Sequence, residues 1–198
     1  MKKIIFAFSL VITLLLSGCS FSFEDGIFKF DNDIEKGIDA DVATVQIGAQ
    51  IVRTDAIELD LSNCSLTNDD ISALEKLKSL QHLKLSHNNI TDISVLVSCE
   101  NLETLDVEGN KIEDFSYLAE LHKLTELNLS KTNIKDLTFL KKLTNLSILD
   151  LSDNSITEFE FVKDLSKLKE LDLSGNNLAA EAVNKVESMI SDICNFIH

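Results

Sequence analysis

The sequence predicts an α/β solenoid, an elongated stack of similar units with a parallel β-sheet on the concave face and short 3₁₀ or helical turns on the convex face. Three observations predict it. Leucine recurs every 22 residues, at Leu80, Leu102, Leu124, Leu146 and Leu168. Two further apolar residues follow each of these leucines after three and five positions, and an Asn or Thr follows after eight. Neither the alternation of a long strand nor the 3.6-residue period of a long helix fits this spacing.

Each part of the unit "LQHLKLSHNNITDISVL" has a physical role. Residues x-L-x-L-x form a short strand whose leucines point inward while the residues between them face solvent. The Asn, here Asn88, satisfies backbone groups where the chain turns out of the strand. One unit cannot bury its own leucines, so stacked units share a core. A fixed period with L-x-x-L-x-L-x-x-N/C-x-L is the signature of leucine-rich repeats, and we expect six of them in residues 56–178.

The N-terminus predicts export. Lys2 and Lys3 precede an apolar run from Ile4 to Leu16, which is too short to cross a bilayer as a helix and is typical of a secretory signal peptide in residues 1–18. The run ends in "LSGC", which resembles the lipobox of bacterial lipoproteins. The resemblance implies transfer of diacylglycerol to the sulfur of Cys19 and cleavage before that residue. The protein would then be extracytoplasmic and anchored by lipid to an inner or outer membrane. The alternative is an ordinary signal peptide with an incidental cysteine.

Both ends of the repeat array need covering. Residues 19–40 would form the lipid-anchored tether, either a poorly ordered linker or a segment whose phenylalanines fold onto the first repeat or lie near the bilayer. In residues 41–55, two short apolar runs flank Gly48-Ala49, which predicts a hairpin that forms an N-terminal β cap. Residues 179–198 place apolar residues on one helical face and predict a C-terminal capping helix.

The stretch "NNITDISVL" resembles the repeat unit of the internalin-like leucine-rich repeats, and the resemblance covers residues 56–178. It implies a curved solenoid that binds other proteins, usually through the concave face. The chain departs from that family where internalins commonly carry Pro, with Val95, Tyr117, Phe139 and Phe161 in its place. This stripe predicts either packing between convex turns or an exposed aromatic ridge.

Candidate binding residues come from three columns of strand positions that face solvent on the concave side. Among their 18 positions there are eight acids, one Lys and no aromatic residue. The candidates are Glu58, Asp60, His82, Lys84, Asp106, Glu108, Glu126, Asn128, Asp150, Glu170 and Asp172. Such a face suits a basic or polar protein partner, and the alternative is a solvated face without a ligand.

Composition argues against several other functions. The net charge of −15 disfavours binding to nucleic acid. The sequence has no Cys/His spacing typical of metal sites and no phosphate-binding glycine loop. Ser86 lies beside two histidines but lacks a third orienting group. We therefore expect no enzymatic activity, no metal and no cofactor, and we expect Cys64, Cys99 and Cys194 to be free thiols because they lie far apart along the solenoid.

Together these features predict a monomeric cell-envelope lipoprotein that binds a protein, for example in adhesion or in contact with a host or neighbouring cell. A structural or scaffolding envelope lipoprotein without a dedicated ligand is the alternative.

Overall fold

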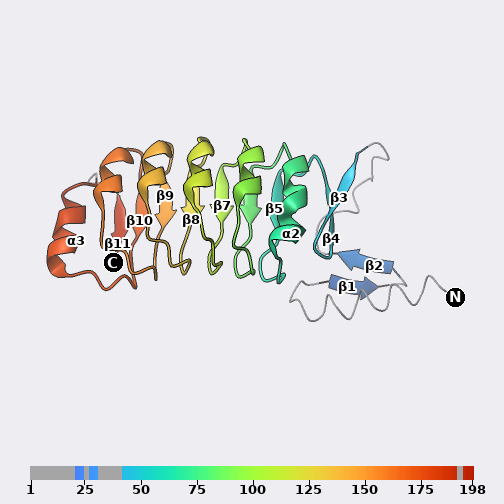
Figure 1. The fold of residues 1–198 in the computed structure, drawn as a ribbon, viewed down its shortest axis with the longest axis horizontal. Helices are drawn as coiled ribbons and strands as arrows, with labels where there is room; N and C mark the ends of the chain where they lie inside the picture. Colours follow the sequence, from blue (N-terminus) through green and yellow to red (C-terminus); the bar gives the residue numbers. More distant parts are fainter. Residues whose placement is uncertain (1–20, 25–26, 31–41, 191–193) are drawn as a thin grey trace.

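The computed structural model describes residues 21–24, 27–30, 42–190 and 194–198 (Figure 1). Its main feature is a seven-stranded parallel sheet with the order β11-β10-β9-β8-β7-β6-β5. The strands are β5 (Glu58–Asp60), β6 (His82–Lys84), β7 (Thr104–Asp106), β8 (Glu126–Asn128), β9 (Ile148–Asp150), β10 (Glu170–Asp172) and β11 (Asn195–Ile197). Sequential neighbours pair throughout, so the predicted solenoid is confirmed.

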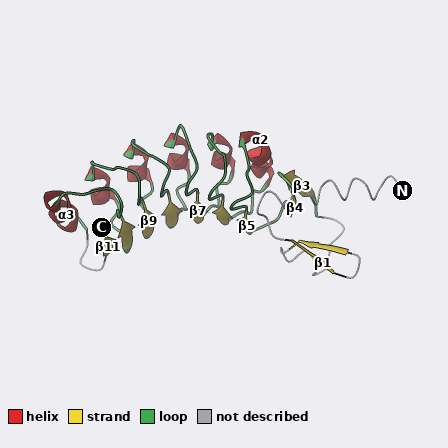
Figure 2. Ribbon diagram, turned by 90° about the horizontal axis from the view of Figure 1, so that it is seen from below, coloured by secondary structure: helices red, strands yellow, loops and turns green. Residues whose placement is uncertain are grey.

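Short helical turns form the opposite side of the stack (Figure 2). They are α2 (Asn68–Ile71) and the 3₁₀ turns η1 (Ser72–Lys76), η2 (Ser94–Ser98), η3 (Ser116–Glu120), η4 (Thr138–Lys142) and η5 (Glu160–Asp164). Between the two sides lies one continuous core. The inward strand leucines are at most 2% exposed from Leu83 to Leu171, and a leucine or valine of each turn from η1 to η5 is at most 3% exposed. Stacking therefore buries the apolar side chains that a single repeat would expose to solvent.

A buried ladder of polar side chains holds neighbouring repeats together. The amide nitrogen of Asn88 donates to the carbonyl oxygens of Leu61 and Leu85, at 2.9 and 2.7 Å. Its amide oxygen accepts from the backbone N–H groups of Cys64 and Leu66. The same arrangement recurs at Asn110, Asn154 and Asn176. The predicted role of this position is confirmed.

The N-terminal end of the core is covered by the antiparallel hairpin of β3 (Thr44–Ile47) and β4 (Gln50–Arg53), as predicted. Gly48 in its turn has a φ of +55°, which glycine adopts without a steric penalty. A Cβ at this position would lie 2.4 Å from Cδ2 of Leu66, so the turn packs directly on the first repeat.

The C-terminal segment differs from the predicted single capping helix. The helix α3 spans Ala180–Glu187, and the chain then returns to the sheet as β11. Phe196 takes the position beside Leu171, while the N–H of Asn195 donates to the carbonyl oxygen of Lys169 at 2.7 Å. Sequence periodicity missed this strand because β11 is only three residues long and its pairing partner lies 25 residues earlier.

Part of the predicted tether forms a second hairpin, with β1 (Phe21–Glu24) antiparallel to β2 (Ile27–Phe30). The predicted signal peptide and Cys19 lie outside the described residues. Within the described part of the chain, no helix has the length and hydropathy needed to cross a membrane.

The cysteines follow the prediction with one exception. Cys99 is buried, Cys194 is half-buried, and both are free thiols. Cys64 is disulfide-bonded, so the prediction of a free thiol there is wrong. That prediction considered only distances along the solenoid, and Cys64 lies in the first repeat, next to the segments that precede the stack.

Candidate functional site

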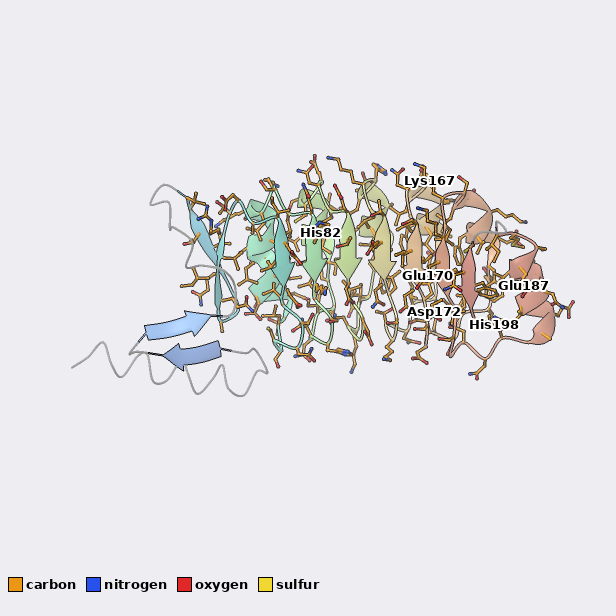
Figure 3. The ribbon with its side chains drawn as sticks, turned by 180° about the vertical axis from the view of Figure 1, so that it is seen from behind. His82, Lys167, Glu170, Asp172, Glu187 and His198 are labelled. Carbon is orange, nitrogen blue, oxygen red and sulfur yellow. The ribbon has the colours of Figure 1, made fainter. Side chains whose placement is uncertain are left out.

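The sheet register aligns the concave side chains into the columns that the repeat spacing predicts. Glu58 pairs with His82, His82 with Thr104, and Glu126 with Ile148, and the following strand adds Glu170. The second column runs in the same way through Asp60, Lys84, Asp106, Asn128, Asp150 and Asp172. Figure 3 shows the labelled His82, Glu170 and Asp172 along this sheet. The structure therefore brings the candidate residues onto one surface.

The second column also builds the fold. Each of its Asp and Asn side chains accepts a hydrogen bond from the backbone N–H two residues later, where the strand ends. The distances are 2.9 Å for Asp60, Asp106 and Asn128 and 2.8 Å for Asp150 and Asp172. Asp and Asn form such turns readily because their short side chains reach this N–H. The D/N-x-S and D-x-E spacings in the sequence carry this signal.

Carboxylates of the first column have no such structural role. Within the described residues, Glu58, Glu126 and Glu170 accept no hydrogen bond through their side chains and form no ion pair. Between them, Nδ1 of His82 lies 3.0 Å from the hydroxyl of Thr104. The glutamates are therefore the carboxylates that a partner reaches without disturbing the fold.

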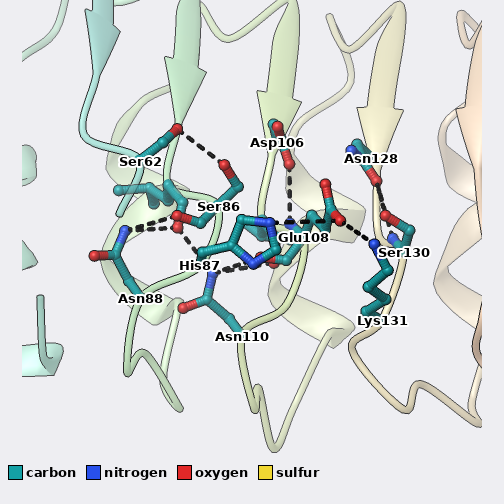
Figure 4. A network of polar contacts seen from close by, with 12 residues as sticks. Ser62, Ser86, His87, Asn88, Asp106, Glu108, Asn110, Asn128, Ser130 and Lys131 are labelled. Carbon is teal, nitrogen blue, oxygen red and sulfur yellow. Dashed lines mark hydrogen bonds and ion pairs between the residues drawn. The ribbon is translucent and has the colours of Figure 1, made fainter. Parts of the chain in front are cut away.

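At the edge of the sheet, the negative charge of Glu108, one of the predicted binding residues, is balanced by neighbouring side chains (Figure 4). Glu108 Oε1 lies 2.7 Å from Nζ of Lys131 and 3.6 Å from Nε2 of His87. The hydrogen bond from Lys131 to Glu108 raises the pKa of the lysine. Gly109 makes room for the cluster, since a Cβ there would lie 2.6 Å from Nδ1 of His87. His87 and Lys131 belong to the surface, and sequence reasoning missed them because they lie one position beyond the three columns.

Partial burial shifts the pKa of Asp106, which lies close to Glu108. The pKa of Asp106 is raised, mainly because its partial burial penalises the charged form and further because Glu108 lies close. The hydrogen bond from the N–H of Glu108 opposes this shift. Asp106 therefore releases its proton at a higher pH than an exposed Asp does.

The C-terminal half of the concave face carries four acids and no basic side chain in its columns. Strands β8 to β10 carry Glu126, Asp150, Glu170 and Asp172, and none of these forms an ion pair within the described residues. The N-terminal half also carries acids, at Glu58, Asp60 and Asp106, but it includes Lys84 and His82 as well. Its edge carries Glu108, which is paired with Lys131. The side chains of β8 to β10 span only about 10 Å because parallel strands lie about 4.8 Å apart.

The aromatic stripe on the convex side is mostly packing. Phe139 and Phe161 are 6% and 8% exposed, and the ring of Phe139 stacks on Phe115 with centroids 6.4 Å apart. Tyr117 is 38% exposed. An aromatic ridge that runs the length of the convex face is therefore not formed.

The rest of the described surface offers little for chemistry. An open groove of about 470 Å³ lies where η4 and η5 begin, lined by residues such as Asp136, Thr138, Glu158 and Phe161. Asp136 is engaged there, since it accepts from the N–H of Thr138 at 2.9 Å. The described residues contain no group of three or more His, Cys, Asp or Glu side chains arranged to hold a metal ion.

Comparison with protein families identifies the repeats. Models described as leucine-rich repeats match residues 57–77, 78–120, 122–163 and 144–185. A search of curated proteins finds no significant match.

Solved structures with the same fold include bacterial and plant leucine-rich repeat proteins. An internalin from Listeria monocytogenes is 30% identical with a TM-score of 0.62, over 73% of this chain and 48% of that one. A leucine-rich repeat protein of Leptospira interrogans is 26% identical with a TM-score of 0.66, over 73% and 38%. The ectodomain of an Arabidopsis thaliana membrane receptor kinase, solved in complex with Casparian strip integrity factor 2, is 26% identical with a TM-score of 0.55, over 70% and 17%. The chain thus spans less than half the length of each of these proteins.

Proposed function

The chain belongs to the leucine-rich repeat proteins, and from that premise we propose that it is a lipid-anchored, extracytoplasmic module that binds a basic protein on its concave face. One observation carries the choice of surface. Glu126, Asp150, Glu170 and Asp172 cluster on β8 to β10 without ion pairs among the described residues. A basic partner would supply the missing charge, and complementary charge raises association rates and excludes acidic competitors.

Related proteins support a binding role. The receptor ectodomain from Arabidopsis thaliana is solved with a bound protein factor. The concave face of this chain has no Trp, Tyr or Arg, the residue types that most often dominate interface energies. Electrostatic complementarity, with many modest contacts, therefore has to provide specificity here.

The test compares two charge reversals of equal size. Glu126→Lys with Glu170→Lys changes the free carboxylates of the concave face, whereas Glu75→Lys with Glu120→Lys changes exposed residues of η1 and η3 on the other side. A partner is first captured from envelope and host extracts with the mature chain and identified by mass spectrometry. We expect the concave pair to slow association roughly tenfold at low salt, and we expect this difference to shrink at high salt. The control pair should bind as the wild type does.

Two results would contradict the proposal. If both pairs bind the partner equally well, the concave face is not the binding surface. If the wild type captures no protein specifically, the alternative of a structural envelope lipoprotein is favoured.

Lipid anchoring rests on the lipobox-like "LSGC" that ends the apolar leader. Mass spectrometry of the mature N-terminus should find an acylated Cys19, and Cys19→Ala should release the protein from the membrane fraction. An unmodified Cys19 in a membrane-bound protein would refute the anchor.

A further inference from the structure

The last strand of the sheet has one open edge. β11 pairs with β10 and ends the seven-stranded order, so within the described residues no strand pairs with its other side. The N–H of Asn195 donates to the carbonyl oxygen of Lys169, and the carbonyl oxygen of Ile197 accepts from the N–H of Leu173. Backbone groups of successive strand residues point to opposite sides of the strand. Phe196 therefore presents its N–H and its carbonyl oxygen at the open edge.

This edge is accessible. In Figure 2, α3 continues the row of helical turns and does not lie in the row of strands. Ile197 is 38% exposed, and Asn195 beside it is exposed as well. Because Ile197 pairs with Asp172, it shares the concave face with that acid. An apolar side chain and unpaired backbone groups thus lie next to the acidic half of the concave face.

The composition of β11 does not protect its edge. Edge strands of soluble proteins are usually kept from pairing by charged side chains, Pro or bulges. The strand at the other end of the sheet, β5, carries two acids among its three residues. β11 reads Asn-Phe-Ile, so it has neither a charge nor a Pro, and only its short length limits pairing. An exposed edge of this kind can accept a strand from another protein.

We propose that the basic partner docks an extended segment on the open edge of β11 and continues the sheet. This inference rests on the proposed function, because it uses acids of the concave face. The register sets Asn195 beside Glu170 and Ile197 beside Asp172, so a strand added to β11 continues both columns. Main-chain hydrogen bonds then provide affinity, and side chains at alternate positions provide specificity.

The acids of β10 select basic residues in the added segment. An added strand lies about 10 Å from β10, which is two strand spacings. A Lys or Arg on its concave side lays its apolar stem across Ile197 and brings its charged head toward Asp172, since long basic side chains cover apolar surface in this way. Asp172 accepts from the N–H of Ser174 through one oxygen, which leaves its other oxygen for such a head.

A second basic residue of the segment is placed by the same register. Two positions from the first, it reaches across Asn195 toward Glu170, whose side chain forms no hydrogen bond or ion pair within the described residues. The segment that fits the edge is therefore extended, with basic residues at alternate positions.

The first experiment uses synthetic peptides and the unaltered mature chain. The probe is a short peptide that alternates Lys with Val, and its binding is measured by fluorescence anisotropy. A peptide that alternates Glu with Val has the same pattern and the opposite charge. Two N-methylated forms of the probe carry methyl groups either on every Lys nitrogen or on every Val nitrogen. Each form keeps the charge and loses the hydrogen bonds of one strand edge.

We expect the Lys–Val peptide to bind, with an affinity that falls as salt is raised, and the Glu–Val peptide not to bind. One of the two N-methylated forms should bind about tenfold or more weakly than the other, because only one edge of the peptide faces β11. Which form is weaker reports whether the added strand runs parallel or antiparallel to β11.

The second experiment changes the protein. Phe196→Pro removes the N–H that points to the open edge, and Pro is compatible with an edge strand whose N–H faces solvent. Phe196→Ala also removes the ring but keeps the N–H, so it is the matched control. We expect Phe196→Pro to bind both the Lys–Val peptide and the captured partner about tenfold more weakly than Phe196→Ala does. Urea unfolding checks that the two variants are equally folded, and the N-methylated peptides test the edge without any variant.

Four results would overturn the proposal. Equal binding of the two N-methylated forms, or of the two Phe196 variants, shows that the partner does not pair with the edge. Binding of the Glu–Val peptide as tight as that of the Lys–Val peptide shows that the acids do not select the segment. A dimer of the chain alone in sedimentation experiments, lost in Phe196→Pro, shows that a second copy occupies the edge instead.

These tests also separate the two hypotheses. If the captured partner responds to reversal of Glu126 and Glu170 but binds both Phe196 variants equally, the concave face remains the binding surface and only the docking on β11 is wrong. If that reversal has no effect, the proposed function is wrong, and this inference with it.

Discussion

Asn154→Ala removes one rung of the buried ladder, and its cost follows from the hydrogen bonds lost. Asn154 is 2% exposed, and its Oδ1 accepts from the backbone N–H groups of Thr132 and Ile134 at 3.0 and 3.3 Å. These two donors have no other acceptor within the described part of the chain. Asn154 also donates to the carbonyl oxygen of Leu129. In the variant this oxygen still accepts a hydrogen bond from the hydroxyl of Thr132.

The expected loss is therefore that of two buried, unpaired N–H groups. Each costs about 1–3 kcal/mol, so the free energy of unfolding should fall by about 2–6 kcal/mol. Thr132→Ala is the matched control, because it removes one hydroxyl donor and leaves the Leu129 carbonyl bonded to Asn154. It should cost about 0.5–1.5 kcal/mol.

Urea unfolding followed by far-UV circular dichroism measures both variants, with equal m-values as the check that one transition is compared. A loss below about 1 kcal/mol for Asn154→Ala, or equal losses in the two variants, would refute the assignment of the cost to unpaired N–H groups.

Three further changes test other parts of the structure. Among the residues that the structure describes, the N–H of Ile112 has no acceptor, and the amide oxygen of Thr132→Asn would supply one. The free energy of unfolding of this variant should therefore rise by about 1 kcal/mol, with a higher urea midpoint; an unchanged midpoint would count against the ladder. Burial raises the pKa of Asp106, so the folded protein binds the proton more tightly and stability falls as pH rises through and above the usual Asp range. Asp106→Asn should therefore be more stable than wild type at pH 7, and the two proteins should be equally stable at a pH below the usual Asp range. Melting temperatures measured across pH test this, and a variant whose stability depends on pH as strongly as that of the wild type would contradict it. Phe139→Ala should lower the free energy of unfolding by about 3–5 kcal/mol because the ring is buried. Tyr117 is exposed, so Tyr117→Ala should lower it by less than about 1 kcal/mol. Comparable melting temperatures of the two variants would contradict the packing assignment.

The sequence predicted the repeat geometry well because that geometry is local and periodic. Leu105 and Leu127 are buried for the same reason, since each is the inward residue of a three-residue strand that recurs every 22 residues. Once the period is known, parallel stacking leaves one register, and the register fixes which side chains share a concave column. The N-terminal hairpin followed from Gly48, whose left-handed backbone the turn requires.

Several features depended on neighbours that no local pattern specifies. Whether Glu108 is a free acid depends on Lys131, 23 residues later, whose side chain reaches from the end of β8 to the neighbouring repeat. The return of the C-terminus as β11 depends on an open sheet edge at β10, which exists only after the repeats have stacked.

The sequence by itself therefore determined the repeat number, the buried positions and the acidic character of the concave face. Only the tertiary structure decided which of those acids are available to a partner. Asp150 is engaged at the end of its strand, whereas Glu170 is free, although both are acids at concave positions. The physical reason is position. Asp150 ends its strand and bonds the N–H two residues later in its own turn, whereas Glu170 begins its strand and accepts no hydrogen bond through its side chain among the described residues.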